Sequence, residues 1–139
     1  MRLIVILSSL LIWVSVGIRP LISDYLYAQY IHTKDKTRYD YLKQAVNLNK
    51  GDTIKLSELA KVYLMQKNFA SAHALLIEVL NHTNGDVVPW TIWTMRAVCE
   101  VQMGQFDAAY KSIDRALTYN PEFTGAVMMK KNLDKAKTK

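Results

Sequence analysis

Apolar and small residues recur along this chain with the spacing of a helix face, and short polar turns separate the segments that carry them. In the clearest segment, residues 93–121, Ala97 precedes a turn at residues 104–107, and Ala109 and Ala116 follow it seven positions apart. Apolar positions that recur every three or four residues predict amphipathic helices. Small residues suit the places where two helix backbones approach closely, so this segment predicts an antiparallel pair of helices.

Glycine, asparagine and proline mark the ends of this predicted pair. Gly104 is expected to end the first helix, because glycine tolerates the left-handed conformation of a helix C-terminus, and Phe106 is expected to fill the turn. Asn120, Pro121 and Glu122 are expected to begin a further helix. Asparagine caps helix N-termini, proline is accepted in the first turn, and a carboxylate favours the positive end of the helix dipole.

The segment resembles one tetratricopeptide repeat (TPR), a helix-turn-helix unit of about 34 residues with a W…A…F…P pattern. Trp93 opens it, Ala109 and Ala116 supply the small residues, and Pro121 closes it. The resemblance implies an all-α fold and a protein that holds other molecules rather than transforming them. Because one such pair cannot bury its apolar face alone, further copies are expected.

Earlier segments of the chain repeat the pattern. Residues 67–72 match residues 104–109 at an offset of 37 positions, and the polar stretch 81–86 accounts for the excess over the usual period. The core positions expected in this second repeat are Leu56, Leu59, Ala60, Tyr63, Ala72, Leu76, Val79 and Leu80. A degenerate first repeat keeps Leu42, Ala45 and Val46 but has no clear turn motif.

The predicted organisation is therefore a short α-solenoid of two to three TPR helix pairs followed by a capping helix with a polar outer face. Its segments are an anchor in residues 1–23, TPR repeats in 24–121 (degenerate 21–50, then 53–81 and 89–120), and a capping helix with a basic tail in 122–139.

The amino-terminal segment differs from the repeats because it is continuously apolar. The uncharged run covers residues 3–18 and extends to residue 22 if Arg19 snorkels to the interface. A bilayer span needs about 20 residues, so this segment predicts an N-terminal transmembrane helix. The corresponding location is the bacterial inner membrane, as a single-pass protein with the TPR repeats in the periplasm. A cleaved signal peptide and a buried core helix remain open as alternatives.

The net charge of +6 belongs to the ends of the chain rather than to the repeats. Arg2 and Arg19 flank the apolar run, and residues 130–139 hold five lysines and one aspartate. A nucleic-acid-binding protein is expected to carry a basic stripe with interleaved aromatic residues. This charge distribution therefore predicts no nucleic-acid partner.

The residues that could carry chemistry do not form a recognisable site. His32, His73 and His82 lack metal-ligand spacing and are expected at the surface or in turns, and Cys99 is the only cysteine, which excludes an intrachain disulfide. Phosphate-binding and dinucleotide-binding motifs are absent from the sequence. The sequence therefore predicts no enzyme, no metal and no cofactor.

The TPR resemblance also implies where a partner would bind, because the first helices of successive TPR units line a concave groove. Carried over to this chain, the groove positions are Tyr27, Tyr30, Lys61, Met65, Thr94, Val98 and Gln102. A chaperone-binding subclass uses Asn, Lys and Arg there to clamp a terminal carboxylate, whereas Lys61 is the only suitable cation here. The groove is expected to bind a partner helix or an apolar peptide. Alternatively, residues such as Met65 simply pack against neighbouring helices.

A second resemblance concerns the order of the segments. An apolar segment followed by a degenerate helix pair and two TPR units looks like the carboxyl-terminal tail of O-antigen ligase or polymerase family membrane proteins. The main prediction is a membrane-anchored TPR scaffold whose partner is a protein or peptide, an integral membrane protein included, and which meets the lipid bilayer through its first helix. The alternatives are an accessory or detached tail of a glycan-assembly system, and an exported soluble periplasmic TPR protein.

Overall fold

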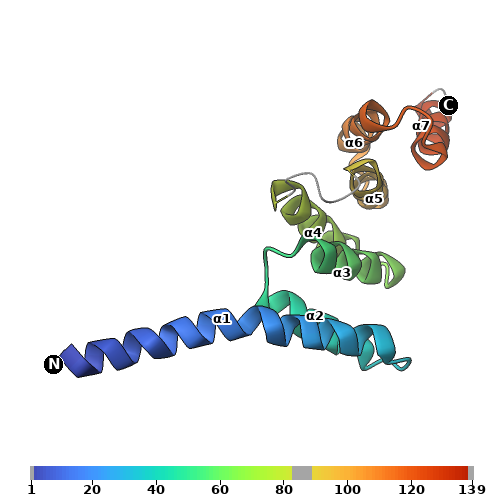
Figure 1. Ribbon diagram of the computed structural model, residues 1–139. Coiled ribbons are helices and arrows are strands. Elements are labelled where there is room, and N and C mark those ends of the chain that lie inside the picture. Colours follow the sequence, from blue (N-terminus) through green and yellow to red (C-terminus); the bar gives the residue numbers. More distant parts are fainter. Residues whose placement is uncertain (1, 83–88, 138–139) are drawn as a thin grey trace. The chain divides into compact units, whose positions relative to one another are not determined.

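The computed structural model describes residues 2–82 and 89–137, and it describes side chains from residue 16 onward up to residue 136. Within these ranges the chain forms seven α-helices and no strand (Figure 1). The helices are α1 (Arg2–His32), α2 (Arg38–Leu48), α3 (Thr53–Met65), α4 (Phe69–His82), α5 (Pro89–Gln102), α6 (Phe106–Tyr119) and α7 (Thr124–Lys137). They belong to two compact units, Met1–Lys55 and Leu56–Lys139, so the boundary falls in the first turn of α3.

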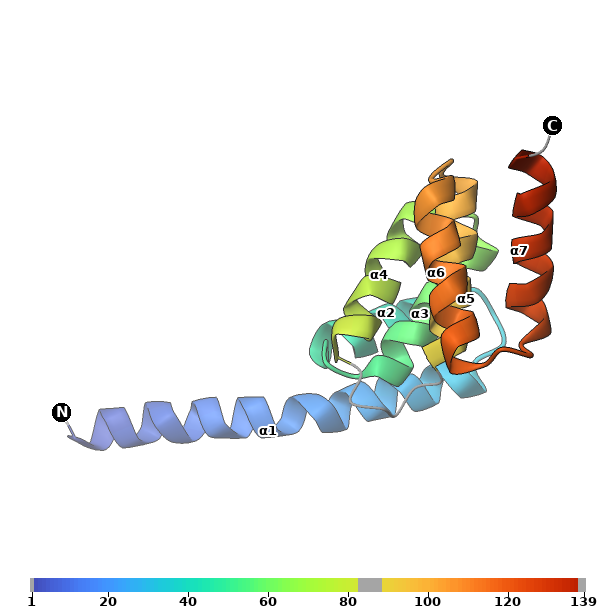
Figure 2. The same ribbon diagram turned by 90° about the horizontal axis from the view of Figure 1, so that it is seen from above.

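The first unit is built by α1 and α2, which lie side by side in both ribbon views (Figures 1 and 2). Leu42 and Ala45 on α2 are fully buried, as the sequence predicted, and Val46 is almost fully buried. On α1 the buried contact includes a polar residue, Ser23, whose hydroxyl donates a 2.8 Å hydrogen bond to the carbonyl of Ala45. This bond satisfies the hydroxyl at the helix–helix contact, where an unpaired polar group would be destabilising.

The predicted membrane location is wrong. In the part of the chain that the structure describes, no helix has the length and apolar character needed to cross a bilayer. The side chains described on α1 include the charged residues Arg19 and Asp24, and the hydroxyl of Ser23 donates its hydrogen bond to α2. For residues 3–15 of the predicted span, the structure describes no side chains.

The second unit contains the two helix pairs predicted from the repeats, α3 with α4 and α5 with α6, followed by α7. α4 packs against α5, α5 against α6, and α6 against α7. The three alanines expected at the close approaches, Ala97, Ala109 and Ala116, are fully buried, which confirms that prediction. They form one core cluster with Ile113, Ala126 and Leu133.

The two turns that join the paired helices have the same backbone conformation. Gly104 has φ of 74° and Lys67 has φ of 58°, so both residues adopt the left-handed conformation. The amide after each residue then donates back to the helix, from Asn68 to the carbonyl of Tyr63 at 2.9 Å and from Gln105 to that of Glu100 at 2.8 Å. This is the Schellman motif, and it confirms both the predicted role of Gly104 and its alignment with Lys67.

The residues that start the second helix of each pair differ. The side-chain oxygen of Asn68 accepts a 3.2 Å hydrogen bond from the amide of Ser71 and so caps α4. Gln105 occupies the same place before α6 and makes no side-chain cap. Two positions matter in such a turn, the residue with positive φ and the residue that caps the next helix. The turn before α6 has a well-suited residue only at the first, Gly104, and the turn before α4 only at the second, Asn68.

Two local predictions about the ends of α6 are wrong. Phe106 is 51% exposed and does not fill the turn. α7 begins at Thr124 instead of Glu122, because the carbonyl of Phe123 accepts the first helical hydrogen bond, from Val127 at 3.1 Å. The side chain of Asn120 does accept the amide of Glu122, at 3.2 Å, but in a turn that precedes the helix.

Candidate partner-binding surface

The seven predicted groove residues are divided between the two units. Tyr27 and Tyr30 lie on α1 in the first unit, and Lys61, Met65, Thr94, Val98 and Gln102 lie on α3 and α5 in the second. Each group is therefore described by itself.

The two tyrosines of the first unit make intramolecular contacts. Their rings stack with centroids 5.8 Å apart. Tyr30 is only 8% exposed, and the guanidinium of Arg38 lies 4.6 Å from its ring centroid. The ammonium of Lys55 lies 5.7 Å from the ring centroid of Tyr27, which is half-buried. Cation–π contacts of this kind stabilise the unit, so little of Tyr30 is left for a partner.

On α3 the predicted groove residues face away from the buried side of the helix. Met65 is 69% exposed and Lys61, one turn earlier, is exposed as well. The buried apolar residues of the same helix are Leu56, Leu59, Ala60 and Val62. Met65 therefore contributes little to the core, and its large apolar side chain is exposed to solvent one turn after Lys61. The alternative interpretation, that Met65 packs against neighbouring helices, does not match this exposure.

The other three predicted groove residues of this unit lie on α5. Val98 and Gln102 follow Lys61 and Met65 by the 37-position offset of the repeats; Val98 is half-buried and Gln102 is exposed. Thr94 is half-buried, and its hydroxyl donates a 2.7 Å hydrogen bond to the carbonyl of Trp90 in its own helix. We define Lys61, Met65, Thr94, Val98 and Gln102 as the α3/α5 surface.

The cation of this surface is already paired. The ammonium of Lys61 lies 2.6 Å from the carboxylate of Glu58, one turn earlier on α3. An exposed pair of this type contributes only weakly to stability and can exchange partners. The α3/α5 surface thus carries one partly neutralised cation among polar and apolar side chains.

Lys55, a charged residue that the sequence reasoning missed, is buried at the start of α3. Its ammonium lies 2.5 Å from Asp24 and 2.8 Å from Asp52. Burial favours the neutral amine, but the hydrogen bonds and charges of these two carboxylates outweigh it and raise the pKa of Lys55. Burial likewise acts to raise the pKa of Asp52, yet its bonds to Lys55 and the charge of Lys55 hold that pKa below its usual value. The burial of Lys55 could have been predicted from helical spacing, because Lys55 lies on the same helix face as Leu59 and Val62.

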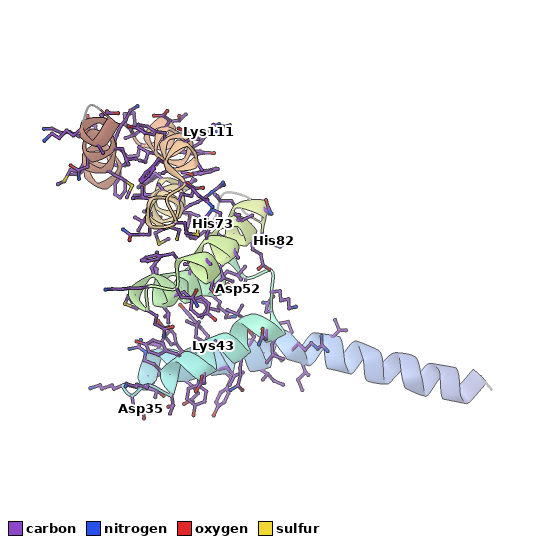
Figure 3. The ribbon with its side chains drawn as sticks, turned by 180° about the vertical axis from the view of Figure 1, so that it is seen from behind. Asp35, Lys43, Asp52, His73, His82 and Lys111 are labelled. Atoms are coloured by element: carbon purple, nitrogen blue, oxygen red, sulfur yellow. The ribbon has the colours of Figure 1, made fainter. Side chains whose placement is uncertain are left out.

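A second buried charge joins three helices of the second unit. Glu100 on α5 is 0% exposed. Its carboxylate accepts hydrogen bonds from Arg96 at 2.8 Å and from the hydroxyl of Ser112 on α6 at 2.6 Å, and it lies 3.2 Å from the ring of His73 on α4. Figure 3 labels this histidine. His73 lies within α4 and its side chain is only 19% exposed, so its predicted place at the surface or in a turn is wrong. With partners from three helices, the carboxylate cross-links the repeats.

The same region holds the single cysteine. Cys99 is fully buried, and burial first, with the charge of Glu100 second, raises the pKa of its thiol to about 11. A thiol in this state is a poor nucleophile at neutral pH. Among the described residues no group of three His, Cys, Asp or Glu side chains is placed to hold a metal ion.

Comparison with known proteins connects this geometry to the TPR fold. No family model matches the chain, and no curated protein matches it. Solved structures do match. The first TPR of Spaghetti (RPAP3) bound to HSP90 peptide SRMEEVD has 13% identity and a TM-score of 0.67, over 90% of this chain and 94% of that one.

Two further structures agree. The Arabidopsis OM64 TPR domain has 15% identity and a TM-score of 0.65, over 88% of this chain and 96% of that one. The N-terminal domain of stress-induced protein-1 (STI-1) from C. elegans has 13% identity and a TM-score of 0.61, over 86% and 94%. At these identities the likeness concerns the fold, and it confirms the predicted all-α TPR architecture. The resemblance to O-antigen ligases and polymerases rests on the sequence alone.

Proposed function

We propose that this protein is a TPR interaction module that holds a peptide or helix of a partner protein on the α3/α5 surface and so helps to assemble a complex. The observation that carries the proposal is the exposure of Met65, 69%, on a helix whose opposite face is buried in the core. Methionine side chains adapt to different apolar partners and are common at peptide-binding surfaces.

The composition of the α3/α5 surface favours a partner with apolar anchors. Met65, Val98 and the stem of Gln102 supply apolar side chains, and Lys61 and Thr94 supply polar ones. An amphipathic helix or an extended apolar peptide fits such a surface, because its apolar side chains leave water while its polar face stays solvated. The role proposed is binding, without catalysis.

The same composition argues against recognition of a terminal carboxylate. One similar structure, the first TPR of Spaghetti, is bound to an HSP90 peptide with the acidic sequence SRMEEVD. Anchoring such an anion calls for several cationic or amide donors in one place. Lys61 is the one cation of the α3/α5 surface, and Glu58 already pairs with it. We therefore propose that partner choice depends on apolar contacts more than on charge.

The test uses the full chain to select ligands from a phage-displayed library of random 12-residue peptides. Affinities of the selected peptides are then measured by fluorescence anisotropy for the protein and for the triple variant Lys61→Ala, Met65→Ala and Gln102→Ala. The expected result is a loss of affinity of at least tenfold in the triple variant, since about 1.4 kcal/mol of lost contact energy corresponds to a factor of ten. The peptide SRMEEVD is expected to bind no better than a scrambled version.

A matched control removes the same side-chain types elsewhere. The variant Lys111→Ala, Met128→Ala and Gln44→Ala changes exposed residues on α6, α7 and α2, and Figure 3 labels Lys111 on α6. Its affinity is expected to stay within twofold of the original. Equal losses in the two triple variants, or none in the first, would reject the α3/α5 surface as the binding site.

A further inference from the structure

Helix α1 is much longer than the helix that packs against it in the first unit. α1 has 31 residues and α2 has 11, which correspond to lengths of about 46 Å and about 16 Å. The contacts between them join Ser23 to Ala45 and Tyr30 to Arg38. α2 therefore covers only the carboxyl-terminal part of α1, and both ribbon views show α1 continuing beyond it (Figures 1 and 2).

The side of α1 that faces away from α2 carries exposed apolar residues. They follow the i, i+3, i+4, i+7 spacing of a single helix face and are Ile18, Leu21, Ile22 and Tyr25. Leu21 is 68% exposed and Tyr25 is 63% exposed. At about 100° per residue, Ser23, which binds α2, falls on the opposite side of the helix. We define these four apolar residues as the α1 face. Exposed apolar residues that gather in this way mark an interaction site.

The sequence continues the apolar spacing towards the N-terminus. The residues at the corresponding positions, three or four apart, are Ile4, Leu7, Leu11 and Val14. The serines and the glycine of the same segment, at positions 8, 9, 15 and 17, fall between them. Apolar residues that alternate at intervals of three and four over several turns are typical of a helix that packs lengthwise on another helix. The pattern therefore predicts a helix as the occupant of the α1 face.

Two opposite charges flank the α1 face. Arg19 and Asp24 lie on opposite sides of it, at about 100° per residue. Arg19 is exposed and forms no ion pair with the residues that the structure describes. Asp24 meets the ammonium of Lys55 at 2.5 Å, yet its side chain stays 68% exposed. Because Lys55 also pairs with Asp52, at 2.8 Å, two carboxylates share one ammonium and leave one net negative charge.

We propose that the α1 face binds the α1 face of a second copy of this chain, as a parallel pair of helices. In a parallel pair with two-fold symmetry, opposite flanks of the two faces meet. Arg19 of each copy then lies beside Asp24 of the other, five residues or about 7.5 Å further along the axis. Each copy thus supplies the cation that balances the excess negative charge of the other. Flanking charges of this kind set partner choice and orientation in helix pairs.

The same charges select against the antiparallel arrangement. In an antiparallel pair, like flanks meet, so Arg19 would lie near Arg19 of the other copy and Asp24 near Asp24. The apolar contact itself is suited to a homodimer, because the cores of such interfaces are more apolar than the rest of a protein surface. A dimer carries two α3/α5 surfaces, so a ligand with two binding segments would be held by avidity. This inference goes beyond the function proposed for a single chain.

Sedimentation equilibrium of the full chain tests the dimer. The expected result is a monomer–dimer equilibrium that Leu21→Glu weakens at least tenfold, because the variant places a carboxylate in the apolar contact. Leu21 is exposed, so the variant is expected to fold. The matched control Met128→Glu puts the same charge in place of an exposed apolar residue on α7 and is expected to change dimerisation less than twofold. Leu21→Glu is expected to leave the affinity for single peptides selected on the α3/α5 surface unchanged.

A double-mutant cycle tests the charge pair. Arg19→Gln and Asp24→Asn are each expected to weaken the dimer at least threefold. Asp24→Asn leaves Asp52 to pair with Lys55. The double variant is expected to be about as weak as either single one, because each change already removes the same interaction. Losses that simply multiply in the double variant would contradict a direct pair.

Cysteine cross-linking tests the orientation. Chains with Ile18→Cys are expected to form a disulfide-linked dimer under air oxidation, because equivalent residues lie opposite each other in a parallel pair. A mixture of Ile18→Cys and Tyr25→Cys chains is expected to give no mixed dimer, since these positions are about 10.5 Å apart along the axis, too far for a disulfide. Gln44→Cys, at an exposed position on α2, is the control, and Cys99 is buried.

Four outcomes would overturn the inference. A chain that stays monomeric would reject the dimer, and equal losses in Leu21→Glu and Met128→Glu would show non-specific association. Mixed disulfides between Ile18→Cys and Tyr25→Cys chains would show an antiparallel pair and remove the charge argument. A monomer that binds phosphatidylcholine vesicles, and loses this binding in Leu21→Glu, would make a lipid surface the occupant. None of these outcomes would affect the function proposed for the α3/α5 surface.

Discussion

Lys67 and Gly104 occupy equivalent positions in the two tight turns of the second unit, and they differ in how well they suit the backbone there. Both residues have positive φ, 58° for Lys67 and 74° for Gly104. A side chain in this region crowds the following carbonyl, at roughly 1–2 kcal/mol for a residue other than glycine. The turn after α3 is thus strained at one residue, while the turn after α5 is not.

Replacing Lys67 by glycine is therefore expected to raise the free energy of unfolding by about 1 kcal/mol, because glycine adopts this conformation without a steric penalty. The measurement is the urea midpoint, followed by circular dichroism. Lys67→Ala serves as the control, since it keeps the Cβ atom and should give no such gain. Gly104→Ala should lower stability by a similar amount through the backbone alone, because an added Cβ there meets no atom within 4 Å. A gain in Lys67→Ala equal to that of the glycine variant would contradict the role of φ.

Some buried residues could be predicted from the sequence and others could not. Helical spacing correctly identified Ala97, Ala109 and Ala116 as core, because small residues at close helix contacts leave a clear pattern. It did not identify Glu100 and Lys55, since a charged residue on an apolar face looks like an irregularity until its partners are known. Those partners come from other helices, His73 and Ser112 for the first and Asp24 for the second. Only the folded chain brings such partners together.

At the scale of the helix, the start of α3 depends on one ion cluster, which Asp24 and Asp52 form around the buried side chain of Lys55. The carboxylate of Asp52 accepts the amides of Ile54 and Lys55, both at 3.1 Å, and so caps the helix. Its other oxygen meets the ammonium of Lys55, which also reaches Asp24 on α1. One lysine thus ties the N-terminus of α3 to α1 within the first unit.

The two pKa shifts at this cluster predict how its contribution to stability changes with pH. The pKa of Asp52 is held below 3.8 by Lys55 although burial opposes this, so its contribution is present above pH 3.8 and is lost as pH falls through the lowered value. The pKa of Lys55 is raised above 10.5 by the two carboxylates although burial opposes this. Its contribution is therefore complete below pH 10.5 and is lost as pH rises through the raised value.

The variant Lys55→Met is expected to lose stability relative to the original chain between about pH 5 and pH 10, and the difference should shrink towards both extremes. Thermal unfolding across this pH range measures it. Lys61→Met is the control, because its ion pair with Glu58 is exposed and contributes little. A difference for Lys55→Met that stays constant from pH 3 to pH 11 would show that the methionine acts by packing rather than by loss of the ion cluster.

The helices themselves were predictable to different degrees. The turns after α3 and α5 were found from the Gly104 motif and its alignment with Lys67, because backbone conformation there depends on local residues. The start of α7 was misplaced by two residues, since Asn120 accepts the amide of Glu122 within a turn before the helix. The apolar segment and the first helix of the degenerate repeat form one helix, α1, which runs from Arg2 to His32 with Pro20 inside it.

At the scale of the whole molecule, the TPR fold was accessible from sequence because each repeat carries its own local pattern. Three solved structures with TM-scores of 0.61 to 0.67 bear out that fold. The membrane location was wrong, because continuous apolar character in residues 3–18 was taken to mean a span. The binding residues could be proposed only through the resemblance, since exposure, which separates Met65 from Tyr30, is a property of the folded chain.

The α3/α5 surface, which carries Met65, is proposed to hold the partner, and hydrogen–deuterium exchange of the full chain, with and without a peptide selected from the random library, tests this proposal. The peptide is expected to slow exchange in α3, Thr53–Met65, and in α5, Pro89–Gln102, and to leave α2, Arg38–Leu48, unchanged. Protection confined to α6 and α7, or spread equally over all the helices, would contradict it.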